Sequence, residues 1–175
     1  MTHKRLWAPW RSGYISTIVR KKVPLKGCIF CQKHRAGVKE QRREYILMQG
    51  RLSFSLLNRY PYNAGHLMIA PYRHVGRLES LTKEEQLEIF ELINDAIARL
   101  ERSMKPTGFN VGVNLGRAAG AGIPGHLHFP IVPRWDGDIN FMPTLADTKV
   151  ISQSLTAVYR LLKRSGPSSA AKKRR

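Results

Sequence analysis

The stretch GHLHFPIVPRW at residues 125–135 carries most of what the sequence predicts about this protein. Its two histidines, His126 and His128, alternate with apolar residues, and alternation with period two is typical of a β-strand. Both imidazoles should therefore point to one face of a sheet. A glycine-rich run at residues 116–122 lies just before the stretch, and such a run lets backbone N–H groups approach an anion closely. An imidazole beside a cradle of this kind is suited to nucleophilic attack on phosphorus.

The segments around this stretch predict an α+β domain on a mostly antiparallel sheet. Short apolar or alternating runs predict strands at residues 45–48, 54–57, 66–70, 109–115 and 126–132. Thr82 and Glu85 form a capping box ahead of a long amphipathic helix, whose apolar residues recur at helical spacing. A second, shorter helix is predicted at residues 152–163. Strands, a helix, strands and a helix in this order favour the α+β class.

The composition bounds the class of protein and its organisation. The chain has 175 residues, 42% of them hydrophobic, which is enough for one domain with a core. Its sequence has no run near the roughly 20 apolar residues that cross a bilayer, and its start lacks the apolar segment of a secretory signal. We therefore expect a cytoplasmic protein without membrane contact. The expected parts are a basic N-terminal segment with a C-x-x-C pair at residues 1–43, the core at 44–163, and a disordered basic tail at 164–175.

The net charge of +18 is concentrated at the two ends of the chain. Residues 1–43 contribute +11 and residues 159–175 contribute +7, whereas residues 44–158 carry equal numbers of acidic and basic side chains. Basic ends favour loose, salt-sensitive contacts with nucleic acid or other polyanions. Solubility among basic proteins explains the same charge equally well, and the sequence leaves both explanations open.

A C-x-x-C pair, Cys28 and Cys31, has the spacing that lets two thiolates bind one metal ion. His74 and His126 could complete a tetrahedral set of ligands. A redox pair uses the same spacing but is expected at the start of a helix that follows a strand, and residues 23–27 make a poor strand. A reduced pair packed as small hydrophobic residues is the third explanation. With two cysteines, a disulfide scaffold is excluded.

Together these motifs resemble the histidine-triad (HIT) superfamily of nucleotide hydrolases and transferases, in which three histidines alternate as His-x-His-x-His. In this chain His126 and His128 fill the first two positions and Pro130 stands at the third. Further segments resemble the branch of diadenosine tetraphosphate phosphorylases and their bacterial relatives: LWAPWR at 6–11, GCIFC at 27–31, NLGR at 114–117 and PRWDGD at 133–138. That branch implies a HIT-like fold, an adenine nucleotide or dinucleoside polyphosphate as substrate, and a homodimer.

The resemblance also implies roles for individual residues. His128 is the implied nucleophile, forming a nucleotidyl-histidine on the α-phosphorus that water or inorganic phosphate then resolves. The residues implied in substrate binding are Asn58 at the ribose hydroxyls, His66 near the sugar or phosphate, Asn114 facing the phosphate, Gly122 and Arg134. For the asparagines, a satisfied turn or strand-end amide is the alternative. Zinc-containing relatives and the galactose-1-phosphate uridylyltransferases imply a closed, structural zinc site on Cys28, Cys31, His74 and His126.

Pro130 is the main departure from the family pattern. Proline has neither a side-chain donor nor a backbone N–H, and losing a hydrogen bond to a charged group, at about 1.5–3 kcal/mol, costs roughly ten- to a hundredfold in rate. Ile123 and Gly125 also stand where other branches carry polar residues. The sequence therefore leaves open an enzyme that acts through His128 and a nucleotide-binding protein with weak or no catalysis. A protein recruited to RNA by its basic ends is a third hypothesis.

Overall fold

The computed structural model describes residues 28–34, 38–138 and 151–166, which include the motif stretch and the C-x-x-C pair. Within these residues the strands are β1 (Ile46–Gln49), β2 (Ser53–Leu57), β3 (Leu67–Pro71), β4 (Gly108–Val111) and β5 (Phe129–Arg134). The helices are α2 (Ile29–His34), α3 (Val38–Arg43), α4 (Lys83–Met104) and α6 (Leu155–Arg164), with a 3-10 turn at Leu78–Ser80. The predicted α+β class, with one long helix and a shorter C-terminal helix, is confirmed.

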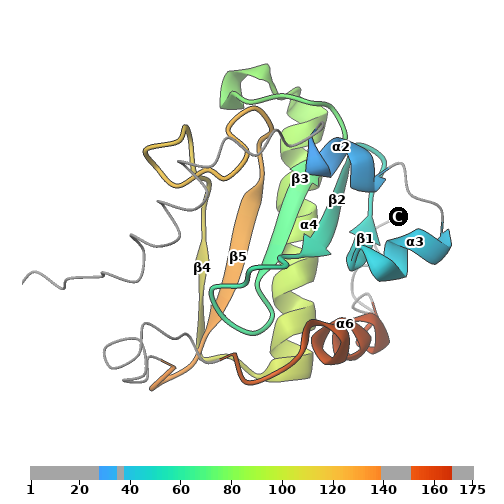
Figure 1. The fold of residues 1–175 in the computed structure, drawn as a ribbon, viewed down its shortest axis with the longest axis vertical. Coiled ribbons are helices and arrows are strands. Elements are labelled where there is room, and N and C mark those ends of the chain that lie inside the picture. Colours follow the sequence, from blue (N-terminus) through green and yellow to red (C-terminus); the bar gives the residue numbers. More distant parts are fainter. Residues whose placement is uncertain (1–27, 35–37, 139–150, 167–175) are drawn as a thin grey trace, which may run out of the picture.

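The strands form one sheet in the order β1-β2-β3-β5-β4, and each neighbouring pair is antiparallel (Figure 1). β4 is therefore an edge strand, and β5 lies between β4 and β3. The connection from β3 to β4 runs through α4, which packs against the sheet. Because β5 is paired on both sides, its residues are held firmly relative to β3.

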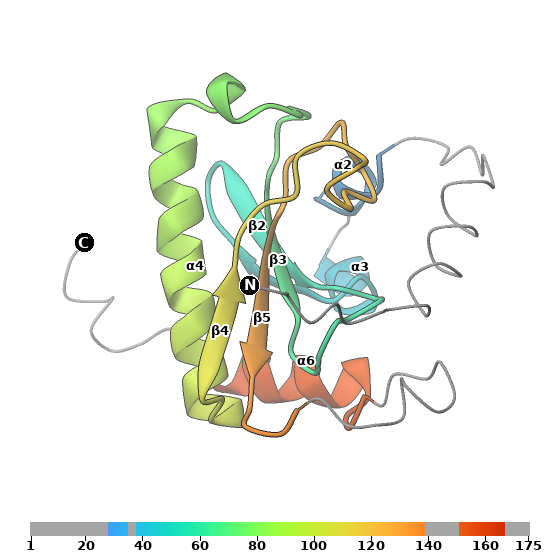
Figure 2. The same cartoon turned by 90° about the vertical axis from the view of Figure 1, so that its left-hand side faces the viewer.

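Two apolar clusters lie on the two faces of the sheet, and Figure 2 shows α4 and α2 on opposite sides of it. The larger cluster joins α4 and α6 to the sheet, with buried members that include Leu67, Ile69, Ile93, Leu100, Leu127, Ile131 and Leu162. The smaller cluster lies on the α2 side and contains Phe30, Ile46, Phe54, Leu56, Met68 and Ala70. The alternation of these two sets along β2 and β3 is the period of two expected for strands buried on both faces.

Helix α4 begins and is held in place through its glutamates. The predicted capping box is present: Thr82 Oγ1 accepts the Glu85 N–H at 3.2 Å, and the Glu85 carboxylate accepts the Thr82 N–H at 2.9 Å. One turn on, Glu88 accepts the backbone N–H groups of Leu52 and Ser53 at 2.8 and 2.7 Å. A β-carbon at Gly50 would overlap the Glu88 carboxylate, so this glycine permits the close approach. The β1–β2 turn is thereby fixed to α4.

The predicted strand at residues 109–115 is shorter than expected, because β4 stops at Val111. The Pro130 carbonyl accepts the Gly112 N–H at 3.3 Å, and the N and O of one residue in an antiparallel strand face the same neighbour. The N–H that proline lacks would therefore point at Gly112 on the β4 side, while pairing of Met68 with Pro130 on the β3 side is undisturbed. Proline is tolerated in this inner strand because it removes a bond only to the edge strand, where β4 ends.

The predicted division of the chain is only partly covered by the structure. Residues 1–27 and 167–175, which carry most of the basic excess, lie outside the described residues, so the disordered tail and the polyanion contact stay predictions. Residues 29–34 form α2, whose Phe30 is 1% exposed and belongs to the core. In the part of the chain that the structure describes, the helices are too short or too polar to cross a membrane.

Candidate active site and metal centre

His126 and His128 lie directly before β5 rather than within the strand as predicted, but they keep its alternation. Leu127 between them is buried in the α4-side cluster and donates its N–H to the Val75 carbonyl at 2.7 Å. The two imidazoles consequently face the other side, toward α2. His126 is 1% exposed, and His128 is half-buried. The predicted placement of both histidines on one face is confirmed.

The orientation of the His128 ring is set by the backbone. Its Nδ1 lies 3.0 Å from the His126 carbonyl oxygen, which can only accept, so Nδ1 carries the proton and donates it. In the neutral ring the lone pair is then on Nε2. Burial lowers the pKa of His128 below its ordinary value, and the hydrogen bond to His126 opposes this only in part. The ring is therefore neutral near pH 7, with Nε2 available as a nucleophile.

The four sequence-predicted metal ligands come together at one point. Their ligand atoms all lie within 4.8 Å of one another: Cys28 Sγ, Cys31 Sγ and the Nδ1 atoms of His74 and His126. The sulfur–nitrogen distances are 3.1 Å for Cys28 to His126, 3.4 Å for Cys31 to His74 and 3.5 Å for Cys31 to His126, and the two nitrogens lie 3.2 Å apart. Ideal tetrahedral zinc bonds give edges of about 3.5 Å for sulfur to nitrogen and about 3.3 Å between nitrogens.

The surroundings of this cluster also suit a metal ion. His126 Nε2 lies 2.9 Å from the Pro71 carbonyl oxygen, which fixes the proton on Nε2 and leaves Nδ1 deprotonated toward the cysteines. The His74 ring lies close to Gly125, where a β-carbon would come within 3.3 Å of its Nε2. Two imidazoles aimed at two sulfurs are the donor set of a Cys2His2 zinc site, and an isolated redox pair does not require them. The residues present therefore fit zinc.

Asn58 and His66 lie beside each other at the far end of β2 and β3. The Asn58 N–H donates to the His66 carbonyl at 2.9 Å, and Asn58 Oδ1 accepts the Tyr60 N–H at 2.9 Å. The Asn58 side chain is thus hydrogen-bonded within a turn, which is the alternative to a binding role that the sequence allows. His66 is 1% exposed, and its Nδ1 accepts the Tyr62 N–H at 3.1 Å, which places the proton of the neutral ring on Nε2. Because Leu67 pairs with Ile131, the neighbouring residues Asn58 and His66 lie about 13 Å along β5 from His128.

Asn114 and Gly122 lie in the loop of residues 112–125, between β4 and the motif histidines. Gly116 and Gly120 in the same loop have φ of +77° and +87°, a backbone conformation that favours glycine. A β-carbon at Gly122 would meet no heavy atom within 4 Å among the described residues, so one side of this backbone is open. The loop is thus shaped by its glycines and accessible to a ligand.

Arg134 is not brought to His128. It ends β5, six residues and about 20 Å along the strand from the nucleophile. Its guanidinium donates to both Asp138 carboxylate oxygens, at 2.6 and 2.8 Å, and to Asn110 Oδ1 at 3.0 Å. The hydrogen bond with Asp138 raises the Arg134 pKa. Within one chain this arginine braces the end of the sheet, and its role in substrate binding stays a prediction.

Phe30 also lies at the site, although no prediction from the sequence singled it out. It stands between the two cysteines, and its ring centroid lies 5.0 Å from that of His126 and 5.1 Å from that of His128. The available signal was its position inside C-x-x-C, but the sequence gives no register between α2 and the motif strand. Only the fold brings Phe30 onto the two imidazoles.

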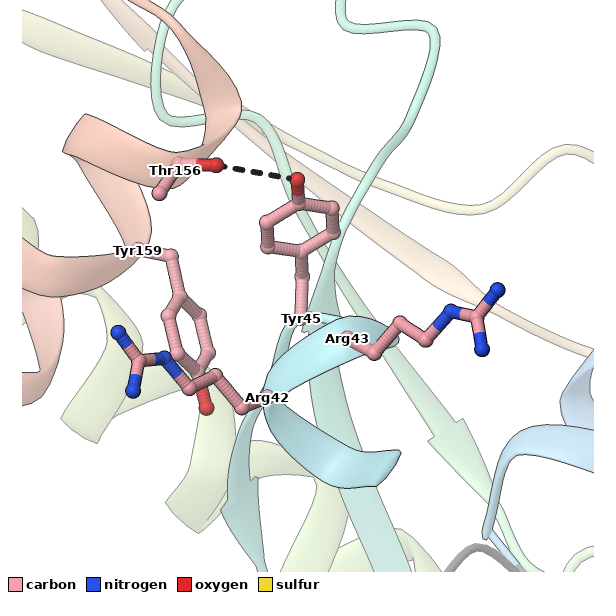
Figure 3. Close-up of a pocket in the computed structure, with 5 residues that line it drawn as sticks. All are labelled: Arg42, Arg43, Tyr45, Thr156 and Tyr159. Atoms are coloured by element: carbon pink, nitrogen blue, oxygen red, sulfur yellow. Dashed lines mark hydrogen bonds between the residues drawn. The ribbon is translucent and has the colours of Figure 1, made fainter. Parts of the chain in front are cut away.

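A second, open pocket lies away from this site, between α3 and α6 (Figure 3). Its lining residues are Arg42, Arg43, Tyr45, Thr156 and Tyr159. The Tyr45 hydroxyl and Thr156 Oγ1 lie 3.2 Å apart and satisfy each other, and the two guanidinium groups point in different directions in Figure 3. The cations do not converge on one anion, so we assign no ligand to this pocket.

Comparison with known proteins agrees with the geometry. The HIT domain family matches residues 39–137. The AP-4-A phosphorylase of Mycobacterium tuberculosis (strain ATCC 25618 / H37Rv) is 40% identical over 160 residues, which cover 91% of this chain and 82% of that protein.

Two solved structures share the fold. The hypothetical histidine triad nucleotide-binding protein of Sulfolobus tokodaii has a TM-score of 0.62 at 21% identity, covering 79% of this chain and 91% of that one. A Zn-bound histidine triad family protein of Mycobacterium smegmatis has a TM-score of 0.62 at 20% identity, covering 80% and 93%. This chain, with its paired motif histidines beside the glycine loop, therefore belongs to the HIT family.

Proposed function

We propose that this protein is a HIT enzyme that cleaves dinucleoside polyphosphates or related nucleoside phosphoanhydrides, with His128 as its nucleophile. The observation that carries the proposal is the hydrogen bond from His128 Nδ1 to the His126 carbonyl, which leaves the Nε2 lone pair for attack. The similarity to a mycobacterial AP-4-A phosphorylase across 91% of the chain supports the substrate class. Adenine nucleotides are accordingly the ligands we expect.

In the proposed reaction, His128 Nε2 donates its lone pair to the α-phosphorus and the phosphoanhydride P–O bond breaks toward the leaving nucleotide. The ring becomes an imidazolium, which the His126 carbonyl stabilises because it already accepts the Nδ1 proton. An oxygen of inorganic phosphate or water then attacks phosphorus, the N–P bond breaks, and His128 returns to its neutral form. With diadenosine tetraphosphate and phosphate the products are ATP and ADP; with water they are ATP and AMP.

The glycine loop is the proposed binding element for the phosphates. Backbone N–H groups of residues 112–125 can approach phosphate oxygens closely where glycine leaves the chain uncovered, as at Gly122. We infer that Asn114 faces the same phosphates, and that Asn58 contacts the sugar further along the sheet, with the buried His66 ring close behind it. Asn58 can rotate away from its turn when a ribose hydroxyl replaces the Tyr60 N–H as its partner.

A zinc ion on Cys28, Cys31, His74 and His126 is the proposed cofactor. When bound with four protein ligands it supplies structural cross-linking, because no position remains for substrate. Those ligands join the segment before α2 to the loop after β3 and to the motif stretch. We therefore assign the metal to the architecture of the site and the chemistry to His128.

Pro130 favours a second candidate, a nucleotide-binding protein with little turnover. The side chain at position 130 faces the same way as His128, and proline there offers no donor to phosphate. This candidate predicts adenine nucleotide binding without a nucleotidyl-histidine.

The deciding experiment is turnover of diadenosine tetraphosphate with and without inorganic phosphate, by wild type and His128→Ala in parallel. ADP formation that requires phosphate and disappears in His128→Ala supports a phosphorylase, and AMP formation without phosphate supports a hydrolase. Turnover that survives in His128→Ala contradicts the assigned nucleophile. Nucleotide binding without turnover by either protein would establish the binding protein instead.

We also propose a homodimer through the β4 edge and the neighbouring flank of α4. Val111 on β4 and Leu115 after it are 45% and 48% exposed, and Phe90 on α4 is 64% exposed. Glu88 binds the β1–β2 turn on one flank of α4, and Phe90, about 200° further round the helix, therefore faces the β4 flank. An edge strand beside an exposed apolar flank is suited to pairing with a second copy. Phe90→Glu should shift a sedimentation profile to the monomer, while an unchanged profile would contradict this surface.

A further inference from the structure

Phe30 connects the metal-binding segment to the proposed nucleophile. It lies two residues after Cys28 and one before Cys31 and is 1% exposed. Its ring is tilted by 32° relative to His128 at a centroid distance of 5.1 Å, which is within the range of direct aromatic packing. The same ring lies 5.0 Å from His126. One side chain thus contacts both motif histidines.

Two restraints act on the His128 ring from different directions. The His126 carbonyl holds the Nδ1 edge at 3.0 Å, and Phe30 packs on the ring. A hydrogen bond to one nitrogen fixes the tautomer but leaves the ring able to swing about its Cα–Cβ bond. A packed aromatic neighbour opposes that swing, because a rotamer on the Phe30 side would overlap a fully buried side chain and a rotamer away from it would lose the ring contact.

Helix α2 does not hold Phe30 in place by itself. It has six residues, and isolated helices of that length are not stable in water. Its position comes from tertiary contacts: the packing of Phe30 and Ile29 in the α2-side apolar cluster, the two cysteines beside His74 and His126, and an ion pair of Lys33 with Glu44 at 3.0 Å. The cysteines flank Phe30 on both sides in the sequence, so the anchoring of their sulfur atoms adds to the apolar packing that holds the ring.

We propose that Phe30 is a positioning residue for His128, through which the cysteine-anchored turn of α2 fixes the direction of the attacking nitrogen. The metal centre then serves catalysis by holding Phe30 against the imidazole, and it does not contact substrate itself. The expected effect on rate rests on the proposed function, whereas the effect on the ring itself does not. Misplacing a reacting group by about 1 Å costs on the order of a hundredfold in rate, so the loss of Phe30 should lower kcat about ten- to a hundredfold.

The test uses Phe30→Ala, Phe30→Leu and a matched control, Phe54→Ala. Phe54 is a fully buried phenylalanine of the same cluster that stacks on Tyr72, so its removal should cost similar stability without touching the imidazole. Four quantities are measured in the zinc-loaded protein: zinc content, the NMR signal of the His128 Nδ1 proton, and kcat and KM for diadenosine tetraphosphate. The Nδ1 signal is assigned by its absence in His128→Gln.

We expect Phe30→Ala to keep its zinc, to lose or broaden the Nδ1 signal, and to lower kcat while KM changes less than about threefold. Phe30→Leu, which keeps apolar volume against the ring, should recover most of the Nδ1 signal and most of kcat. Phe54→Ala should keep the signal and kcat. An intact Nδ1 signal in zinc-loaded Phe30→Ala would overturn the proposal, as would equal losses in Phe54→Ala or loss of zinc from Phe30→Ala. If the protein does not turn over diadenosine tetraphosphate, the Nδ1 signal still decides whether Phe30 positions the His128 ring.

Discussion

Replacing Pro130 with histidine tests whether the third motif position limits turnover. Side chains alternate along β5, so an imidazole at position 130 would face the same side as His128, about 7 Å further along the strand. There it can donate one hydrogen bond to a phosphate oxygen. A hydrogen bond to a charged group contributes about 1.5–3 kcal/mol, so Pro130→His should raise kcat by about ten- to a hundredfold if the bond forms in the transition state.

The backbone effect of the same substitution can be separated from the imidazole. Restoring the N–H at position 130 returns a donor to the Gly112 carbonyl just after β4, and this hydrogen bond contributes about 0.5–1.5 kcal/mol to stability. Removing the rigid proline costs about 0.4–1 kcal/mol through the entropy of the unfolded chain. The two effects nearly cancel. Pro130→Ala makes this backbone change without adding a donor to the side chain and is the matched control.

The assay is the initial rate of diadenosine tetraphosphate cleavage at saturating phosphate, with product separation and a thermal melt of each variant. We expect Pro130→His to exceed wild type in kcat while Pro130→Ala stays near wild type, with melting temperatures that agree closely. A folded Pro130→His protein whose kcat is no higher than that of wild type would refute the reasoning. An equal rise in Pro130→Ala would assign the gain to β4 pairing and refute the role of the imidazole.

Three further predictions concern the scaffold of the site. Glu88→Ala should lower the free energy of unfolding by about 2–4 kcal/mol, because the β1–β2 turn loses the acceptor of its N–H groups. Glu91→Ala, at an exposed position on the same helix, should change it by under about 0.5 kcal/mol. Urea denaturation of both variants checks this, and equal effects would contradict a stabilising role for the Glu88 hydrogen bonds. Chelation of the purified protein should release about one zinc per chain and lower the melting temperature, and Cys31→Ser should start from the lower value; a melt indifferent to chelator would count against a metal site. The hydrogen bond from Arg73 lowers the pKa of Glu85, so the stability it gives is complete above the unfolded pKa of about 4.3 and is lost as pH falls through the lower, folded pKa. Arg73→Gln should therefore show a shallower loss of unfolding free energy below about pH 4.3, and parallel acid curves would show that this pair contributes nothing.

Local patterns predicted the elements whose causes are local. The long helix follows from the Thr82–Glu85 capping box and from apolar residues at helical spacing, and its start is where the sequence places it. The facing of His126 and His128 follows from alternation, which survives even though the strand begins only at Phe129. In both cases the information lies within a few residues of the chain.

Long-range features depended on the resemblance or were missed. Spacing alone suggested that Cys28 and Cys31 share an ion, but the distance in sequence to His74 and His126 says nothing about their meeting in space. The early end of β4 depends on which neighbour the backbone of Pro130 faces, and that register is a property of the assembled sheet. Phe30 was overlooked for the same reason, because a core phenylalanine and a positioning one look alike in the sequence.

The two motif histidines owe their different roles to the nitrogen that each gives to the backbone. His126 uses Nε2 to bind the Pro71 carbonyl, so its Nδ1 points to the cysteines as a ligand. His128 uses Nδ1 to bind the His126 carbonyl, so its Nε2 keeps a lone pair for phosphorus. The carbonyl that orients the nucleophile therefore belongs to the residue that the metal centre holds. A loss of metal that lets His126 shift should disturb His128 through this carbonyl as well as through Phe30, and the two routes separate in Phe30→Ala, where only the carbonyl remains.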